Sequence, residues 1–178
     1  RGDGGDEHFA GYRSYRASSL AWTGVHAIPP AFRPAVESTA LKLSDWLHSS
    51  AARRLLRLSP VAENASRLER YGRLLSCVTP PELHATRQTH WCRAEQVVLG
   101  AQPAEVPMLG APNQLPELAF TRQCMLADAV DYLPDDILCK VDRASMAVSL
   151  EVRCPLLDRR VIELAWRLPF SLLRSGRT

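Results

Sequence analysis

Acidic residues alternate with glycines near the start of the chain, in GDGGDEHFAGYRSY. The carboxylates of Asp3, Asp6 and Glu7 suit a hard cation such as Mg²⁺, which usually takes only one or two carboxylates beside substrate phosphates. Glycines let a backbone approach a ligand closely, and N–H groups at a helix N-terminus suit phosphate. The pattern therefore indicates a magnesium–nucleotide site. It is also typical of a turn followed by a helix cap, and both interpretations stay open.

A second set of charges lies near the C-terminal third, at Asp135, Asp136, Lys140, Asp142 and Arg143. Asp136 and Lys140 are four residues apart and can pair along one helix face. Charges that are buried on such a helix need partners, because burying a charge alone is costly. Internal salt bridges and a substrate site explain this segment equally well.

A third set lies in EVRCPLLD, where Glu151 and Arg153 fall on the same side of an extended segment. This spacing favours a structural ion pair over chemistry, because such pairs are common without function. Asp158 is most simply the N-cap of the last helix.

Histidines and cysteines give no metal or disulfide pattern. None of the five histidines has H-x-x-x-H spacing, and none of the five cysteines forms C-x-x-C. These counts argue against a zinc cluster and against a disulfide framework. Reduced thiols in a cytoplasmic protein are the simplest interpretation, so we expect a cytoplasmic location.

The elements that must position these residues are helical by their periodicity. Acidic residues suit a first turn at Asp6 and Glu7, and apolar positions then recur up to Leu20. Further helices are expected at 32–47, 53–58, 61–75, 80 onward, 118–132, 134–148 and 158–167, with a long loop at 100–116 and one extended stretch at 151–157. The pattern predicts a mainly α fold, an irregular helical bundle.

Size and composition limit which classes of protein and which kinds of partner the chain fits. The chain has 178 residues, which suggests one domain, with 46% apolar and 23% charged residues as in soluble globular proteins. A formal net charge of +3 does not by itself imply a nucleic-acid partner, and the scattered arginines indicate solvated helix faces. No apolar run approaches the ~20 residues of a membrane span, and no signal-peptide pattern is present. We expect neither nucleic acid nor membrane as a partner.

Two longer stretches carry a family resemblance. GDGGDEHFAGYRSYR (2–16) and YLPDDILCKVDRASMAVSLEVRCPLLDRRVIELAWRLP (132–169) resemble, in the right order, two segments of the synthetase domain of glutamine-hydrolysing asparagine synthetases. The middle of the chain, including RYGRLLSCVTPPEL, is similar to the family's variable linking helices. The resemblance implies that residues 1–178 are the helical part of an α/β synthetase domain of the ATP-pyrophosphatase type, similar to the adenine nucleotide alpha hydrolases.

The resemblance also implies a reaction. Such a domain uses Mg²⁺ and ATP to activate aspartate as β-aspartyl-AMP, and ammonia released from glutamine then displaces AMP. The resemblance assigns Gly2, Gly4 and Gly5 to the nucleotide, Asp3 to acyl-adenylate formation, Asp6 to the magnesium–pyrophosphate, and Asp142 and Arg143 to the amino-acid substrate. The implied partners are aspartate, ATP and ammonia, and a homodimer of a longer parent protein.

Several positions depart from the family's pattern. Arg1 stands where the family usually has Ser, His8 replaces an aliphatic residue, and Cys154 and Leu156 vary R-x-P-F-L-D. An N-terminal cysteine nucleophile, an S-G-G-x-D-S phosphate loop and the downstream lysine segment do not occur in this sequence. We therefore interpret 1–178 as a fragment of a carbon–nitrogen ligase, without the glutaminase domain, and we expect the isolated chain to make no asparagine.

Two alternatives to asparagine synthesis remain open at this point. β-Lactam synthetases, lasso-peptide cyclases and polysaccharide-associated amidotransferases resemble the same domain, so the adenylated acid is not settled by the resemblance. The second alternative is a non-catalytic helical module that binds a protein partner, which exposed apolar surface would favour.

Overall fold

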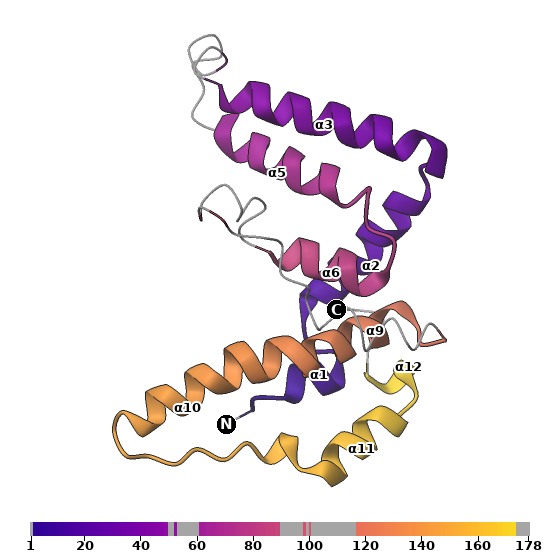
Figure 1. Cartoon of the computed structure of the whole chain (residues 1–178). Coiled ribbons are helices and arrows are strands. Elements are labelled where there is room, and N and C mark those ends of the chain that lie inside the picture. Colours follow the sequence, from indigo (N-terminus) through magenta and orange to yellow (C-terminus); the bar gives the residue numbers. More distant parts are fainter. Residues whose placement is uncertain are drawn as a thin grey trace. The chain divides into compact units, whose positions relative to one another are not determined.

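The structure is a computed structural model that describes residues 2–49, 52, 61–89, 98, 100 and 117–173. Within these ranges it contains helices and no strand, which confirms the mainly α class (Figure 1). The helix expected at 53–58 lies outside the described residues, as does the loop expected at 100–116 except for Gly100.

The chain divides into two compact units, and each is described by itself. The first comprises Arg1–Ala17 and Val106–Thr178, and the second comprises Ser18–Glu105. The assignment of residues 1–178 to a single synthetase domain stays a prediction.

The first unit carries the residues singled out for chemistry. Its elements are α1 (Gly5–Phe9), the start of α2 (Arg13–His26), α9 (Phe120–Ala127), η3 (Asp128–Leu138), α10 (Cys139–Met146), η4 (Pro155–Leu157), α11 (Arg159–Arg167) and α12 (Phe170–Leu173). The predicted acidic first turn is confirmed, because Asp6 and Glu7 begin α1. The helix does not continue to Leu20, however, because Ala10 adopts φ 59° and ends α1 before α2 begins.

The expected break at Pro134 is wrong. Helical structure runs from Phe120 to Met146 without interruption, and the central part, Asp128–Leu138, is a π-helix that contains the proline. In an α-helix the proline ring clashes with the carbonyl four residues earlier. The i→i+5 bonding of a π-helix changes that spacing, which is how a helix can carry a proline here. Figure 1 shows the resulting long helix, which ends in α10.

The core of the first unit joins α2 to α9. Its fully buried members are Tyr15, Cys124 and Met125, and the partly buried side chains packed around them are Ala10, Tyr12, Phe120, Trp166, Phe170 and Leu173. Arg122 of α9 donates to the carbonyl oxygens of Ala165 and Leu168 at 3.4 and 2.6 Å. This guanidinium therefore satisfies carbonyls at the C-terminus of α11, where a cation also meets the negative end of the helix dipole.

The second unit contains the rest of α2, η1 (Pro30–Phe32), α3 (Arg33–His48), α5 (Val61–Arg73) and α6 (Pro80–Gln88). The break at Pro29 and Pro30 and the helix opened by Pro80 and Pro81 are as predicted. Thr79 caps α6 in a reciprocal pair with Glu82, which fixes where that helix begins.

Helices α3 and α5 lie side by side and antiparallel (Figure 1). Gly72 permits their close approach, because a Cβ there would lie 3.1 Å from the Cβ of Ala40, and the Ser44 hydroxyl donates to the Ala65 carbonyl at 2.9 Å. The apolar stripe predicted on 32–47 faces outward in part. It lines a shallow groove of about 410 Å³ formed by Phe32, Ala35, Val36, Thr39, Ala40, Leu43 and Leu68.

Among the described residues, no helix combines the length and the apolar character that crossing a bilayer requires.

Candidate functional site

The acidic turn, Gly2–Asp6, is a tight bend that leads into α1. The Gly5 N–H donates to the Gly2 carbonyl at 3.1 Å, and Gly4 takes a left-handed conformation with φ 89° as the residue before the helix. Glycine is suited to this position because other residues are strained there. Asp3 is partly buried and Asp6 is exposed, so this bend presents both predicted carboxylates near the surface.

Glu7 points inward, in contrast to its two acidic neighbours. Its side chain is only 1% exposed, and the Tyr12 hydroxyl donates to its Oε1 at 2.5 Å. Burial raises the pKa of Tyr12 above its usual range, and the hydrogen bond to Glu7 adds to the shift. Tyr12 therefore stays protonated and donates. Glu7 is a buried acceptor that holds the turn in place, and it is not available at the surface to bind a ligand.

Leucines of η4 cover two of the three glycines assigned to the nucleotide. A Cβ on Gly4 would overlap the Leu157 side chain, and a Cβ on Gly5 would lie 2.9 Å from Cδ1 of Leu156. A Cβ on Gly2, in contrast, would meet nothing within 4 Å. The structure thus gives Gly4 and Gly5 a packing role against the leucines and leaves Gly2 open to a ligand.

An open groove of about 640 Å³ lies between α10 and the segment that leads to α11. It is lined by Leu138, Val141, Asp142, Val152, Arg153, Cys154, Pro155, Leu157 and Asp158. Asp142 is one of the two residues assigned to the amino-acid substrate, and the structure places it here. The neighbouring Arg143 is exposed and is not among the lining residues. This region, which we call the α10 groove, contains carboxylates and a guanidinium on otherwise apolar walls.

Cys154 connects the α10 groove to the acidic turn. Cys154 lines the groove, and its thiol lies 3.8 Å from Oδ2 of Asp3. Asp3 therefore lies against a residue of the groove that Asp142 also lines, although the two acids are far apart in the sequence. Arg153 also lines the groove, while its guanidinium pairs with Glu151 at 2.8 Å as the sequence predicted.

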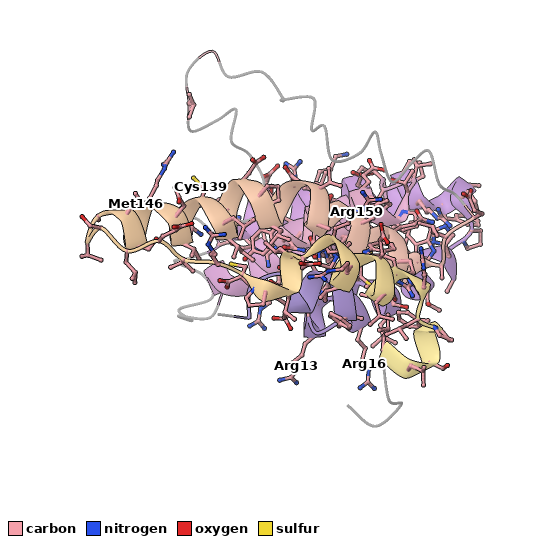
Figure 2. The ribbon with its side chains drawn as sticks, turned by 90° about the horizontal axis from the view of Figure 1, so that it is seen from below. Arg13, Arg16, Cys139, Met146 and Arg159 are labelled. Carbon is pink, nitrogen blue, oxygen red and sulfur yellow. The ribbon has the colours of Figure 1, made fainter. Side chains whose placement is uncertain are left out.

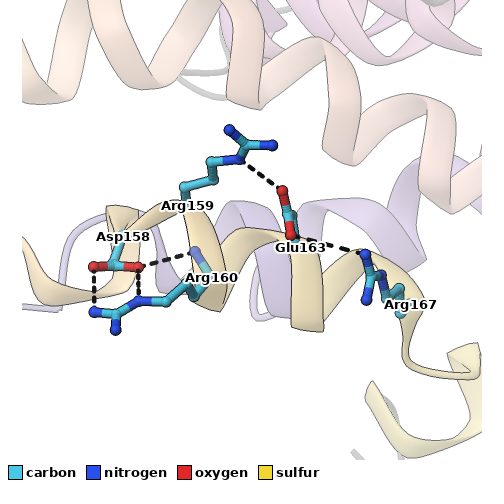
Figure 3. Close-up of polar contacts among 5 residues, drawn as sticks. All are labelled: Asp158, Arg159, Arg160, Glu163 and Arg167. Carbon is cyan, nitrogen blue, oxygen red and sulfur yellow. Dashed lines mark hydrogen bonds and ion pairs between the residues drawn. The ribbon is translucent and has the colours of Figure 1, made fainter.

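Asp158 has the structural role that was expected of it (Figure 3). Its Oδ1 accepts from the Arg160 N–H at 2.9 Å, which caps α11, and the Arg160 guanidinium contacts both carboxylate oxygens at 3.0 Å. These hydrogen bonds from Arg160 lower the pKa of Asp158 to about 2. The same view shows Glu163 pairing with Arg159 and Arg167 along α11.

Several further charged side chains lie at the surface. Arg13 and Arg16 of α2 point away from the ribbon, as expected for a solvated helix face (Figure 2). Lys140 pairs with Asp136, which confirms the salt bridge predicted for this helix. Met146, labelled near the end of α10 in Figure 2, is 56% exposed.

His8, which replaces an aliphatic residue of the family's pattern, has a defined partner. Its side chain is 4% exposed, and the indole N–H of Trp166 donates to its Nδ1 at 3.2 Å. Burial lowers the pKa of His8. A neutral imidazole that accepts this bond fits the site, because protonation would turn Nδ1 into a donor.

The donor set around the acidic turn fits a magnesium ion only if a substrate supplies further oxygens. Among the described residues, no group of three or more His, Cys, Asp or Glu side chains is arranged to hold a metal. Mg²⁺ commonly binds through one or two carboxylates together with phosphates and water. The exposed Asp6 and the partly buried Asp3 match that mode, and they do not match an all-protein cage.

The sequence did not predict that Leu156 and Leu157 cover Gly5 and Gly4, or that Cys154 lies beside Asp3. No local signal could have found them, because their partners lie about 150 positions away in the chain. Arg153 was interpreted only as half of an ion pair, although it lines the groove as well.

Comparison with known proteins gives a family. A family model described as Asparagine synthase matches residues 1–178, which is the whole chain. Searches of curated proteins and of solved structures each found no match.

Proposed function

The chain belongs to the asparagine synthase family, and from that we propose that its acidic turn and α10 groove serve the ATP-dependent adenylation of aspartate. Family membership supports an asparagine synthetase-like, ligase-type function that uses ATP. The finer proposal concerns the acid substrate, the intermediate and the role of each residue.

One observation carries this proposal: Cys154 lines the α10 groove and contacts Asp3, which joins a predicted adenylation residue to a predicted substrate residue. An acyl group and a nucleotide must meet within bonding distance for adenylation. The contact between Cys154 of the α10 groove and Asp3 of the acidic turn supports such a meeting.

The groove has the charges that a zwitterionic amino acid needs. The Asp142 carboxylate attracts an ammonium group, and the Arg153 guanidinium has five N–H donors, of which the pair with Glu151 uses only part. Both charged groups are exposed at the open groove, so they are free to meet a substrate that enters it. We assign Asp142 to the α-ammonium group and Arg153 to a carboxylate of aspartate.

The proposed reaction has two steps. An oxygen of the side-chain carboxylate attacks the α-phosphorus of ATP, and the bond from that phosphorus to pyrophosphate breaks, which gives β-aspartyl-AMP. Ammonia then attacks the acyl carbon, AMP leaves, and the nitrogen loses a proton to give asparagine. We infer that glutamine is the source of the ammonia, as in the family that the sequence resembles.

The turn contributes positioning and electrostatics. Gly2 offers uncovered backbone to the nucleotide, and Asp3 faces the reacting carboxyl from beside the groove. Asp6 would hold Mg²⁺, which when bound neutralises charge on the phosphates. Positioned charges of this kind supply most of the catalysis in phosphoryl and nucleotidyl transfer.

The test is aspartate-dependent ATP–pyrophosphate exchange by the full-length protein. We expect Asp3→Asn and Asp6→Asn each to lower the exchange rate by about 100-fold, the usual effect of removing one transition-state electrostatic contact. Asp142→Asn should instead raise the KM for aspartate by about 10-fold or more, because an ion pair to the substrate is lost. Asp135→Asn is the matched control, since Asp135 is exposed and does not line the groove.

The outcomes separate the proposal from its competitors. If exchange depends on another acid, that acid is the substrate in place of aspartate, and the adenylation part of the proposal stands. No exchange with any acid would refute the proposal and favour a partner-binding helical module. The exposed apolar side chains of Met146, Val148 and Leu150 are consistent with that alternative.

A further inference from the structure

Gly11 lies two residues after the end of α1, and its φ does not explain why it is glycine. The left-handed position at the end of α1, where glycine is most common, is occupied by Ala10 with φ 59°. Gly11 itself is not among the residues with positive φ. A left-handed backbone therefore does not favour glycine here, and the space around its Cα is what distinguishes it.

The space beside Gly11 is filled by Asp6. A Cβ on Gly11 would overlap Oδ1 of Asp6, and it would lie 2.9 Å from Cγ and 3.1 Å from Cα of the same residue. The Gly11 N–H also donates to the Asp6 carbonyl at 2.9 Å. Gly11 therefore cannot move away without losing the hydrogen bond that closes α1, and Asp6 cannot keep its side-chain position if a methyl group is added.

We propose that Gly11 is a positioning residue for Asp6: it leaves the space in which the Asp6 carboxylate lies and so sets the direction in which that carboxylate points. This inference rests on the proposed function, because Asp6 is the residue assigned there to the metal-bound phosphates. Gly11 acts only through Asp6, since it contributes no side chain of its own.

The chain offers a matched control for this steric argument. Gly24 is exposed in α2, and a Cβ there would meet nothing within 4 Å. Gly24→Ala adds the same methyl group as Gly11→Ala at a site where nothing must move. Alanine is also favoured over glycine inside a helix, so this control should not lower stability.

The first experiment is a double-mutant cycle measured by urea unfolding of the full-length protein. Gly11→Ala should lower the unfolding midpoint in the wild-type background, and clearly less in the Asp6→Ala background, where Oδ1 and Cγ are gone. The Gly24→Ala midpoint should not fall. Equal losses from Gly11→Ala in both backgrounds would overturn the proposal, because the strain would then not involve the carboxylate.

The second experiment measures aspartate-dependent ATP–pyrophosphate exchange as a function of Mg²⁺ concentration. We expect Gly11→Ala to lower the maximal rate about 10- to 100-fold, the scale of a misplaced catalytic group, and to raise the half-saturating Mg²⁺ concentration. A lower rate with an unchanged Mg²⁺ midpoint would show a merely structural role and refute the proposal. If the wild-type protein shows no exchange, the proposed function fails, and the unfolding cycle alone decides whether Gly11 is coupled to Asp6.

Discussion

Replacing Tyr12 by Phe tests what holds the acidic turn against the core. The change removes the hydroxyl that donates to Glu7, and it keeps the ring, whose centroid lies 5.7 Å from that of Tyr15 and 6.4 Å from that of Tyr132. The aromatic contacts therefore survive, and only the hydrogen bond to a carboxylate that is 1% exposed is lost.

The expected cost follows from the type of bond. A hydrogen bond to a charged group contributes about 1.5–3 kcal/mol, and truncating the donor leaves the carboxylate with less solvation in the interior. We expect Tyr12→Phe to lower the free energy of unfolding by about 2 kcal/mol. For a cooperative unit of ~100 residues, a loss of that size lowers the thermal midpoint by about 10 °C.

The assay is equilibrium unfolding in urea with Tyr71→Phe as control. Tyr71 is 58% exposed on α5, so its hydroxyl is already solvated and its removal should change stability by no more than about 0.5 kcal/mol. Glu7→Gln supplies a second background, in which the amide oxygen still accepts but carries no charge. Tyr12→Phe should cost only about 1 kcal/mol there, the value of a neutral hydrogen bond.

An equal effect of the two tyrosine variants would refute this reasoning. The Glu7 carboxylate would then be solvated by some other group, and the Tyr12 hydroxyl would not be what fixes α1. Loss of stability that is identical in the Glu7 and Gln backgrounds would instead show that the charge is unimportant.

Two further predictions concern titration and thiol reactivity. Because burial lowers the pKa of His8, the unfolded chain takes up its proton at about pH 6.5 and the folded chain does so only at lower pH, so stability should fall as the pH drops below about 6.5. Urea midpoints from pH 7.5 to 5.5 measure this, and His8→Leu should show a flatter profile. Burial also raises the pKa of Cys77 to about 11, and its side chain is 3% exposed. Iodoacetamide at pH 8, mapped by mass spectrometry, should therefore label the partly buried Cys154 at least ~10-fold faster than Cys77, with the two rates converging in urea.

Local signals in the sequence predicted the ends of helices well. Acidic residues marked the start of α1, the pair Pro80–Pro81 marked the start of α6, and Asp158 capped α11. Each of these features acts within one helical turn of its own residue, so the neighbouring residues in the sequence are sufficient to predict it. The ion pairs Asp136–Lys140 and Glu151–Arg153 were predictable for the same reason.

The failure at Pro134 has a different cause. Proline is a reliable helix breaker only against α-helical geometry, and a π-helix gives a different spacing between the ring and the preceding carbonyls. π-Helices are rare, so the sequence pattern gives no reason to expect one here.

The glycines around the acidic turn illustrate why the site could be predicted only in part. Composition marks them all as flexible, yet the structure separates them by what occupies the missing side chain: leucines from η4 at Gly4 and Gly5, the Asp6 carboxylate at Gly11, and nothing at Gly2. Gly2 is thus the one of the three glycines assigned to the nucleotide whose Cβ position is open, and the nucleotide role of all three stays a prediction. The contacts of Gly4 and Gly5 with the leucines span almost the whole chain, so no pattern within the glycine segment itself could predict them.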